Sequence, residues 1–410
     1  MEFIIKIRIT IFVTKLDSGG AFLAVKRLID GLDTSIYEIK VITKKNSRKE
    51  IFYYFKKILE SFYRRYGLKK NSHISLSLAG LSERYLKDIL DKTDIILLTW
   101  VNDGLLNIRN LDQIIKTNKK IFWRLSDMWP ITGGCHYSGD CINFKSECRE
   151  CPQENIIFQK IGLTKYFQLK KSKIFNKENA INLLAPSKWM INQVNDSHIF
   201  AQQEVNCFQI GTSADTKIFF KKDLKKSKNK FEIDYQDFVI GVGAKGIFSD
   251  KRKGFDLFLE MINSIKGDQE KKIHVLIFGE ETKKPTFVEH RVTILGEINQ
   301  NDLSHVYNAC DLFVSTTRFE NLANTLIEAN MCGCPVLAFG VGGYNDVIEN
   351  GKNGYNIEPF DIDYMAKLIK ESLFLYEFNR EAIAKDTKSH YSVEYRSKIL
   401  EGILKVNDCE

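Results

Sequence analysis

Proline, methionine and tryptophan are scarce in this chain of 410 residues, which contains six, six and four of them. A long hydrophobic run is also lacking. The most apolar stretch, residues 3–13, is too short to cross a membrane and is interrupted by Lys6 and Arg8. No small-residue cleavage site follows it, so it does not have the pattern of a signal peptide. We expect it to form the first buried strand of a parallel sheet.

The sequence contains no arginine-rich tail and no nucleic-acid-binding module, so it predicts no nucleic-acid partner. Its net charge of +8 is uneven, because residues 1–205 contain 33 Lys and Arg against 21 Asp and Glu, a net charge of +12. The remaining residues contain 27 against 31, a net charge of −4. A basic half suits an anionic membrane surface or an acceptor that bears phosphate.

A segment at residues 50–66 combines aromatic and basic side chains, among them Phe52, Phe55, Phe62, Arg64 and Arg65. A basic helix with aromatic side chains can lie in a membrane interface. The aromatic side chains of a surface helix can equally pack on the helix's own sheet. Both interpretations stay open, and the first would add a peripheral contact with an anionic membrane.

Four of the nine cysteines fall within a short insertion at residues 133–152, next to His136. Two of them have good metal-chelate spacing, and the other two are spaced more loosely; the four are Cys135, Cys141, Cys148 and Cys151. Four thiolates can hold a tetrahedral zinc, and a structural zinc is the interpretation that we favour. Free buried thiols or a redox-labile pair are the alternatives. The other five cysteines are dispersed, which predicts a reducing cytoplasm, with the inner face of the cell membrane as a second location.

Residues 318–343 have the pattern of one parallel βαβ unit with the strand that precedes them. Apolar runs at residues 311–315 and 336–339 predict the two strands, and apolar side chains at helical spacing lie between them. We expect Asn321 or Asn324 to cap the helix. Glu320 precedes the helix, whose amides favour a phosphate, and Glu328 within it could bond the hydroxyls of a ribose.

Two glycine patterns follow predicted strands. Gly19 and Gly20 stand at the turn after the first strand, where glycine allows a ligand to approach the backbone. Gly241, Gly243 and Gly246 nominally fit a dinucleotide fingerprint. That fingerprint requires a helix to start within the glycines, whereas we expect this helix to start near residue 255. The sequence therefore argues against an NAD-dependent oxidoreductase.

The spacing of Glu320 and Glu328 resembles the Glu-x7-Glu signature of retaining GT-B glycosyltransferases of family 4, the glycosyltransferase group 1. The segments Lys253-Gly254-Phe255 and Pro186-Ser187-Lys188-Trp189 resemble further features of that family. The segment that starts Asp127-Met128-Trp129-Pro130 resembles a polysaccharide-biosynthesis subgroup, in which a His stands at the position of Ser126. That His lies near the donor sugar in the family, so its replacement bears on activity or on the sugar contact.

The resemblance implies an α/β fold of the GT-B class, with two facing Rossmann-like domains and a cleft between them. Residues 1–206 would form the N-terminal acceptor domain with the Cys-rich insertion 133–152. Residues 207–388 would form the C-terminal donor-binding domain. Residues 389–410 would form a helix that packs back toward the N-terminal domain.

The resemblance also implies a reaction: retaining transfer of a hexosyl unit from a UDP- or GDP-sugar to a saccharide, in the synthesis of a surface polysaccharide such as capsule or O-antigen. The acceptor would be lipid-linked in many such pathways. No metal would be needed for catalysis, because cationic side chains would balance the diphosphate. A non-catalytic GT-B subunit and a nucleotide-sugar epimerase are the alternatives.

Residue roles follow from the same resemblance. Glu320 would bond hydroxyls of the reacting sugar, and Lys253 would stabilise the leaving diphosphate. Asp127, with Asp103 as a second candidate, would orient or deprotonate the acceptor. The implied donor-binding residues are Gly19, Gly20, Gly243, Arg252, Lys253, Gly296, Ile298, Glu320, Asn321, Leu322, Thr325 and Glu328.

Overall fold

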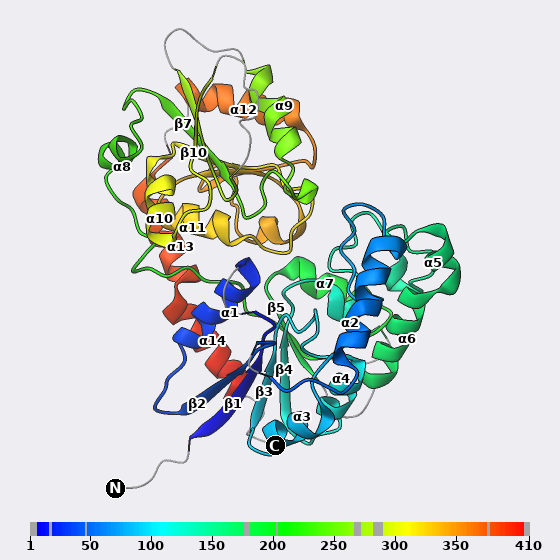
Figure 1. Cartoon of the computed structure of the whole chain (residues 1–410). Helices are drawn as coiled ribbons and strands as arrows, with labels where there is room; N and C mark the ends of the chain where they lie inside the picture. The colour runs from blue at the N-terminus through cyan, green and yellow to red at the C-terminus, as the bar shows by residue number, and fades with distance from the viewer. Residues whose placement is uncertain are drawn as a thin grey trace, which may run out of the picture. The chain divides into compact units, whose positions relative to one another are not determined.

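The computed structural model divides into two compact units (Figure 1). Unit 1 comprises residues 1–210 and 400–410, and unit 2 comprises residues 211–399. The boundary expected after residue 206 lies close to this division. The structure describes residues 6–15, 19–45, 47–175, 181–201, 204–265, 272–281, 290–374 and 378–405.

Unit 1 contains a six-stranded parallel sheet in the order β2-β1-β3-β4-β5-β6. The central strands β3 and β5 are buried at every position, which explains their nearly continuous apolar sequences. The strand expected within residues 3–13 is β1. The bounds are β1 (Ile7–Phe12), β2 (Tyr37–Ile42), β3 (Ile95–Leu98), β4 (Lys120–Arg124), β5 (Asn182–Ala185) and β6 (Cys207–Gln209).

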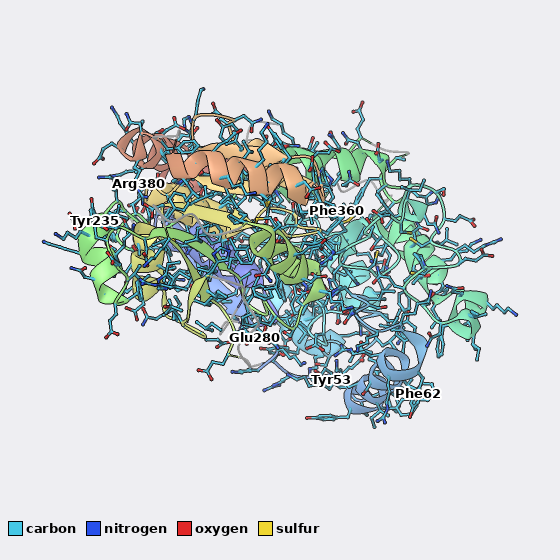
Figure 2. All side chains as sticks on the ribbon, turned by 90° about the horizontal axis from the view of Figure 1, so that it is seen from above. Tyr53, Phe62, Tyr235, Glu280, Phe360 and Arg380 are labelled. Carbon is cyan, nitrogen blue, oxygen red and sulfur yellow. The ribbon has the colours of Figure 1, made fainter. Side chains whose placement is uncertain are left out.

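Helices flank this sheet, and several are fixed by side-chain caps. The Ser82 and Ser187 side chains accept hydrogen bonds at the starts of α3 and α7, and Asn107 forms a capping box with Asn110 at α4. Phe62 of α2 lies at the outside of unit 1 (Figure 2). The helices are α1 (Gly20–Asp30), α2 (Tyr53–Phe62), α3 (Glu83–Leu90), α4 (Ile108–Ile115), α5 (Ile156–Ile161), α6 (Leu163–Phe175) and α7 (Lys188–Asp196).

Unit 2 contains a second six-stranded parallel sheet, in the order β12-β11-β10-β7-β8-β9. One continuous core of buried side chains lies against it. The bounds of its strands are β7 (Phe238–Gly243), β8 (Ile273–Phe278), β9 (Arg291–Ile294), β10 (Leu312–Ser315), β11 (Val336–Phe339) and β12 (Gly354–Ile357).

The helices of unit 2 connect these strands. α14 starts in unit 2, and its residues from Leu400 onward belong to unit 1, where the Glu401 carboxylate accepts a hydrogen bond from the Asp33 amide at 2.9 Å. Among the described residues, no helix has both the length and the apolar character needed to span a bilayer. The helices are α8 (Leu224–Lys230), α9 (Phe255–Ser264), α10 (Gln300–Ala309), α11 (Asn324–Met331), α12 (Ile362–Phe374), α13 (Arg380–Tyr391) and α14 (Val393–Lys405).

The βαβ unit expected around residues 318–343 is confirmed as β10, α11 and β11, with β10 and β11 paired in parallel. The expected helix cap was wrong. The residue before α11 is Ala323, and no side chain caps this helix end, because the chain enters α11 three residues after Asn321 and Asn324 is already helical.

Candidate functional site

Three loops of unit 2 meet around Glu320, which precedes α11. Its Oε2 accepts hydrogen bonds from Lys253 Nζ at 2.7 Å and from Arg252 Nη1 at 2.9 Å. Arg252 also donates to the Phe319 carbonyl and, through Nη2, to Asp250. Two of the predicted donor cations thus share one carboxylate, and we call Arg252, Lys253 and Glu320 the charged cluster.

The charged cluster is largely shielded from solvent, since its three side chains are 13–14% exposed. Burial by itself would raise the pKa of the Glu320 carboxyl, but Lys253 and Arg252 outweigh burial and lower that pKa to about 2. Glu320 is therefore a carboxylate at neutral pH. Because Arg252 also pairs with Asp250 at 3.0 Å, two cations face two carboxylates and their formal charges balance.

Glycine backbone geometry brings the charged cluster together. Gly254 has a left-handed φ of +70°, and a Cβ there would lie 1.9 Å from the Thr316 carbonyl oxygen. Gly342 has a φ of +56°, and a Cβ there would lie 1.7 Å from the Glu320 carbonyl oxygen. Both positions exclude any other residue without movement of the backbone. The Arg318 amide also donates to the Arg252 carbonyl at 2.8 Å.

Glu328 lies in α11, as expected, but its side chain is buried and accepts a hydrogen bond from the Tyr307 hydroxyl at 3.2 Å. The role of Glu328 toward a ribose therefore stays a prediction. Asn321 is buried beside the charged cluster, and its amide donates to Glu320 Oε1 at 3.2 Å. Leu322 and Thr325 are half-buried at the start of α11.

The remaining predicted donor positions of unit 2 lie in loops after strands. Gly243 ends β7, where a Cβ would lie 2.6 Å from the Phe278 carbonyl oxygen. Gly296 follows β9, has a φ of +66° and accepts a hydrogen bond from the Gly279 amide at 2.7 Å. Ile298 packs partly against the core of unit 2. Because α9 starts only at Phe255, the glycines after β7 do not form a dinucleotide turn.

One Asp-x-Asp sequence, Asp361-Ile362-Asp363, occurs at the start of α12. The Asp361 carboxylate accepts a hydrogen bond from the Tyr364 amide at 2.9 Å. Asp361 thus serves as a cap for this helix, and the motif by itself gives no reason to place a metal there.

Asp127, the main acceptor candidate, follows β4 in unit 1 and is buried. Its Oδ2 lies 2.6 Å from His136 Nδ1, and its Oδ1 accepts from the Trp129 amide at 2.8 Å. His136 Nε2 lies 2.8 Å from the hydroxyl of half-buried Ser75. Ser75, His136 and Asp127 thus form a hydrogen-bonded series, which we call the relay. The imidazole ring stands 5.8 Å from the Trp100 ring.

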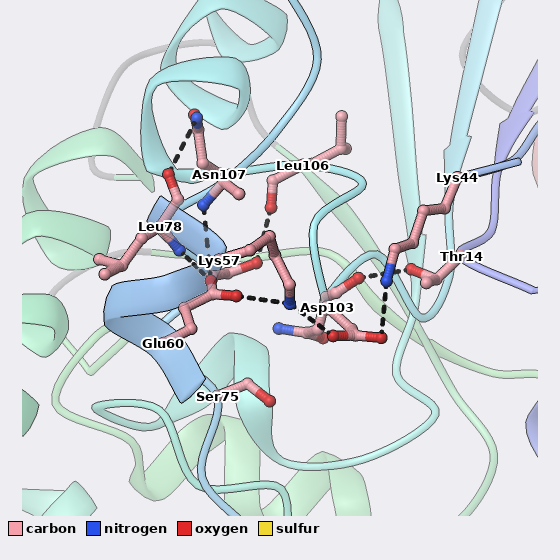
Figure 3. A network of polar contacts seen from close by, with 12 residues as sticks. Thr14, Lys44, Lys57, Glu60, Ser75, Leu78, Asp103, Leu106 and Asn107 are labelled. Carbon is pink, nitrogen blue, oxygen red and sulfur yellow. Dashed lines mark hydrogen bonds and ion pairs between the residues drawn. The ribbon is translucent and has the colours of Figure 1, made fainter. Parts of the chain in front are cut away.

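Asp103, the second acceptor candidate, follows β3 and belongs to a network of ion pairs (Figure 3). Its carboxylate contacts Lys44 Nζ at 3.0 Å and Lys57 Nζ at 2.8 Å, and Lys57 also pairs with Glu60 at 2.6 Å. Burial would raise the pKa of Asp103, but the two lysines outweigh it and the pKa is lowered. Asp103 has a left-handed φ of +56°, a strained conformation for a residue with a side chain.

The turn after β1 brings Gly19 and Gly20 to the start of α1. Gly19 has a φ of +103°, and a Cβ there would meet no atom of the described residues within 4 Å, so the backbone conformation favours glycine. Ser126, at the position of the family's His, accepts a hydrogen bond from the Arg124 guanidinium at 3.3 Å. These positions lie at carboxyl ends of parallel strands, where α/β sheets bind ligands.

The four clustered cysteines line one small cavity of about 20 Å³. Burial raises the pKa of the Cys148 thiol to about 11 and that of Cys151 to about 12, and the Gly133 amide donates to Cys148 Sγ at 3.2 Å. Within the described ranges, however, no group of three or more His, Cys, Asp or Glu side chains is arranged to hold a metal ion. As placed, the four thiols do not form a ready zinc site, and the structural zinc stays a prediction.

The sequence did not predict two residues at or near the relay, Ser75 and Lys171. Ser75 lies about sixty positions from its partner His136 in the chain, and the antiparallel bridge between Ile74 and Cys135 brings them together. The fully buried Lys171 lies 3.6 Å from the centre of the Trp129 ring and donates to the Trp129 and Thr132 carbonyls. Burial lowers the pKa of Lys171 to about 7. A lysine in the middle of a helical pattern gives no sequence signal of such burial.

Known proteins resemble this chain in sequence and in fold. Residues 238–389 match the family model "Glycosyl transferases group 1". Over 254 residues, the chain is 24% identical to the capsular polysaccharide biosynthesis glycosyltransferase CapM of Staphylococcus aureus, with 58% of this chain and 63% of CapM covered. The chain spans between 18% and 63% of the length of the curated relatives compared with it.

Among solved structures, the sucrose-phosphate synthase of Thermosynechococcus elongatus superposes with a TM-score of 0.65 at 13% identity, covering 98% of each chain. The Anabaena protein Alr3699/HepE, solved in complex with UDP, superposes with a TM-score of 0.62 at 14% identity, covering 98% of this chain and 100% of HepE. At these identities the superpositions establish the fold. The two parallel sheets have the GT-B fold, and residues 238–389 are similar to the glycosyl transferases group 1.

Proposed function

We propose that this protein is a glycosyltransferase that moves a hexosyl unit from a nucleoside-diphosphate sugar to a saccharide acceptor. The observation that carries the proposal is the charged cluster of unit 2, where Lys253 and Arg252 converge on Glu320. Its location within the group 1 match supports a donor site there. The neighbour HepE binds UDP and UDP-glucose according to its solved complexes, so UDP-sugars are the first donors to test.

The chemistry requires charge balance at the leaving diphosphate. Negative charge builds on the β-phosphate oxygen as the glycosidic bond breaks, and Lys253 and Arg252 would stabilise it without a metal. Glu320, held as a carboxylate, would then accept hydrogen bonds from hydroxyls of the sugar ring. We propose retention of configuration by attack on the same face of the sugar, since Glu320 is engaged by two cations and is poorly suited as a nucleophile.

On the acceptor side, the relay changes the role that we assign to Asp127. Both of its oxygens are engaged, by His136 and by the Trp129 amide, so Asp127 is better suited to position His136 than to contact an acceptor. An acceptor hydroxyl in contact with Ser75 would give its proton to the Ser75 oxygen while the Ser75 hydroxyl proton passes to Nε2 of His136. We propose a saccharide of surface polysaccharide synthesis, lipid-linked, as the acceptor; the similarity to CapM supports this class.

A thermal-shift screen over UDP-, GDP- and ADP-sugars tests the donor site, because a ligand that binds only the native state raises the melting temperature. We expect one nucleotide class to stabilise the protein, and Lys253→Gln to abolish that shift. The exposed neighbour Lys251 offers a matched control, and Lys251→Gln should retain the shift. No shift with any nucleotide would contradict the donor site.

Turnover separates the candidate functions. A transferase consumes donor only when an acceptor is present, an epimerase converts it without acceptor, and a non-catalytic subunit binds it without turnover. With polyprenyl-linked saccharides as acceptors, we expect product from wild type and a loss of about two orders of magnitude in Lys253→Gln. Metal analysis of untagged protein tests the separate zinc prediction, which absence of zinc would contradict.

A further inference from the structure

The helix α2 is amphipathic, but its apolar side faces solvent and not the core. Its inner side presents Tyr53 and Glu60, with Glu60 bound to Lys57 and to the Leu78 amide (Figure 3). Its outer side is apolar and aromatic, although a surface helix normally turns such side chains toward the core. The exposed apolar and aromatic side chains on and beside α2 are Ile51, Phe52, Tyr54, Phe55, Ile58, Leu59, Phe62 and Tyr66.

This apolar surface continues onto α5 and α6, which lie beside α2 in Figure 1. The Asn155 side chain donates to the Tyr66 carbonyl at 2.8 Å, and the Tyr63 ring packs edge-on against Phe158. Both helices add exposed apolar side chains, of which Ile157 is 72% exposed. The contributing residues are Ile156, Ile157, Ile161, Tyr166 and Leu169, and with the exposed residues of α2 and Tyr66 they form what we call the apolar face.

The segments that carry the apolar face are strongly basic. Residues 51–70 and 155–175 contain eleven Lys and Arg and one acid, the buried Glu60. The net charge of these 41 residues is therefore +10, which exceeds the +8 of the whole chain. Exposed members of this set are Arg64, Arg65, Lys69, Lys70, Lys160, Lys170 and Lys173.

Next to the apolar face, an open groove of about 570 Å³ runs along α5 and α6. Arg149, Lys160 and Lys165 line it together with Glu150, Ile161 and other apolar side chains. Outside this lining, Glu147 pairs with Arg149 at 3.5 Å and with Lys165 at 2.9 Å. Basic and apolar side chains in one lining match a phospholipid, which has both a headgroup phosphate and acyl chains.

We propose that the apolar face docks on an anionic lipid bilayer, with its aromatic and aliphatic side chains at the acyl boundary and its basic side chains at the headgroup phosphates. The charge favours lipid over a protein partner, because the cores of protein interfaces are depleted of lysine. Tyrosine and lysine side chains suit the membrane interface, because each has an apolar part and a polar end that stays hydrated. The inference does not depend on transferase activity.

Sedimentation with vesicles tests the proposal. We expect the full chain to bind vesicles of phosphatidylcholine and phosphatidylglycerol at least about tenfold more tightly than vesicles of phosphatidylcholine alone. Binding should weaken at high salt, because salt screens exposed charges. The triple substitution Phe55→Ser, Ile58→Ser and Phe62→Ser should abolish binding, and replacing Arg64, Arg65 and Lys160 with Gln should remove the preference for anionic lipid.

A matched control removes exposed aromatic side chains from unit 2, with Tyr235→Ser and Tyr364→Ser, and should bind vesicles like wild type. Circular dichroism and the nucleotide thermal shift should stay unchanged in the triple variant, which separates this proposal from that of the donor site. Wild-type binding by the triple variant would overturn the proposal. A concentration-dependent dimer that the triple substitution dissociates would also overturn the proposal, because the apolar face would then be an interface between two copies of the chain.

Discussion

Glu320 balances the charge of Lys253 and Arg252, the cations that we propose for the donor site. Replacing it with Gln removes the carboxylate that Lys253 and Arg252 share and leaves Arg252 paired with Asp250, which we expect to destabilise unit 2 by about 3 kcal/mol. A diphosphate would supply the missing negative charge. We therefore expect UDP, or whichever nucleotide binds, to raise the melting temperature of Glu320→Gln by more than it raises that of wild type.

The nearby ion pair of Asp256 with Arg318 provides the control for this prediction. Arg318 contacts Asp256 at 2.7 Å, whereas the ion pairs of Glu320 Oε2 are with Arg252 and Lys253. The substitution Asp256→Asn should therefore leave the rise in melting temperature with nucleotide at its wild-type size. If nucleotide raises the melting temperature of Glu320→Gln by no more than it raises that of wild type, the two cations do not bind the diphosphate.

The depressed pKa of Glu320 also predicts a pH dependence of stability. The folded carboxyl titrates at about 2, below the value of about 4.3 expected for an unfolded chain. The Glu320 carboxylate thus contributes about 3 kcal/mol to the free energy of unfolding above pH 4.3, and this contribution is lost as the pH falls toward 2. In urea unfolding, the stability gap between wild type and Glu320→Gln should narrow from pH 6 to pH 3, whereas a constant gap would contradict the assignment.

At the scale of elements, two glycines illustrate how turns build the charged cluster. Gly342 has no room for a Cβ, which would lie 1.7 Å from the Glu320 carbonyl oxygen, and its φ is left-handed. We expect Gly342→Ala to cost at least about 2 kcal/mol and to abolish nucleotide binding. Gly402 in α14 has open space around its Cα, so Gly402→Ala should stabilise the protein by about 1 kcal/mol. Equal effects of the two substitutions in thermal melts would refute this argument.

The sequence predicted elements better than it predicted contacts. Periodicity located β10, α11 and β11, because their apolar patterns match a buried strand and an amphipathic helix. The Lys-Gly-Phe motif placed Lys253 correctly after β7, but the shared pairing of Lys253 and Arg252 with Glu320 spans nearly seventy residues and has no local signal. The relay is equally non-local, and the reversed face of α2 cannot be told from a core-facing one by periodicity alone.

The chain as a whole consists of two parallel α/β units, each with its own six-stranded sheet. The group 1 match lies entirely within unit 2, whereas the net charge of +10 on residues 51–70 and 155–175 lies in unit 1. This division separates the proposed tasks, since nucleotide recognition belongs to unit 2 and membrane docking belongs to unit 1. Nucleotide and lipid vesicles should therefore affect different parts of the chain.

Hydrogen exchange measured with UDP or with anionic vesicles tests this division in the intact protein. We expect nucleotide to slow amide exchange most at residues 250–256 and 316–328, because the cations and the start of α11 lie there. Vesicles should slow exchange mainly at residues 51–70 and 155–175, and should leave the segments around Lys253 unchanged. Vesicles of phosphatidylcholine alone serve as the control and should protect neither region. Nucleotide protection confined to unit 1, or vesicle protection centred on unit 2, would overturn the assignment of the two tasks.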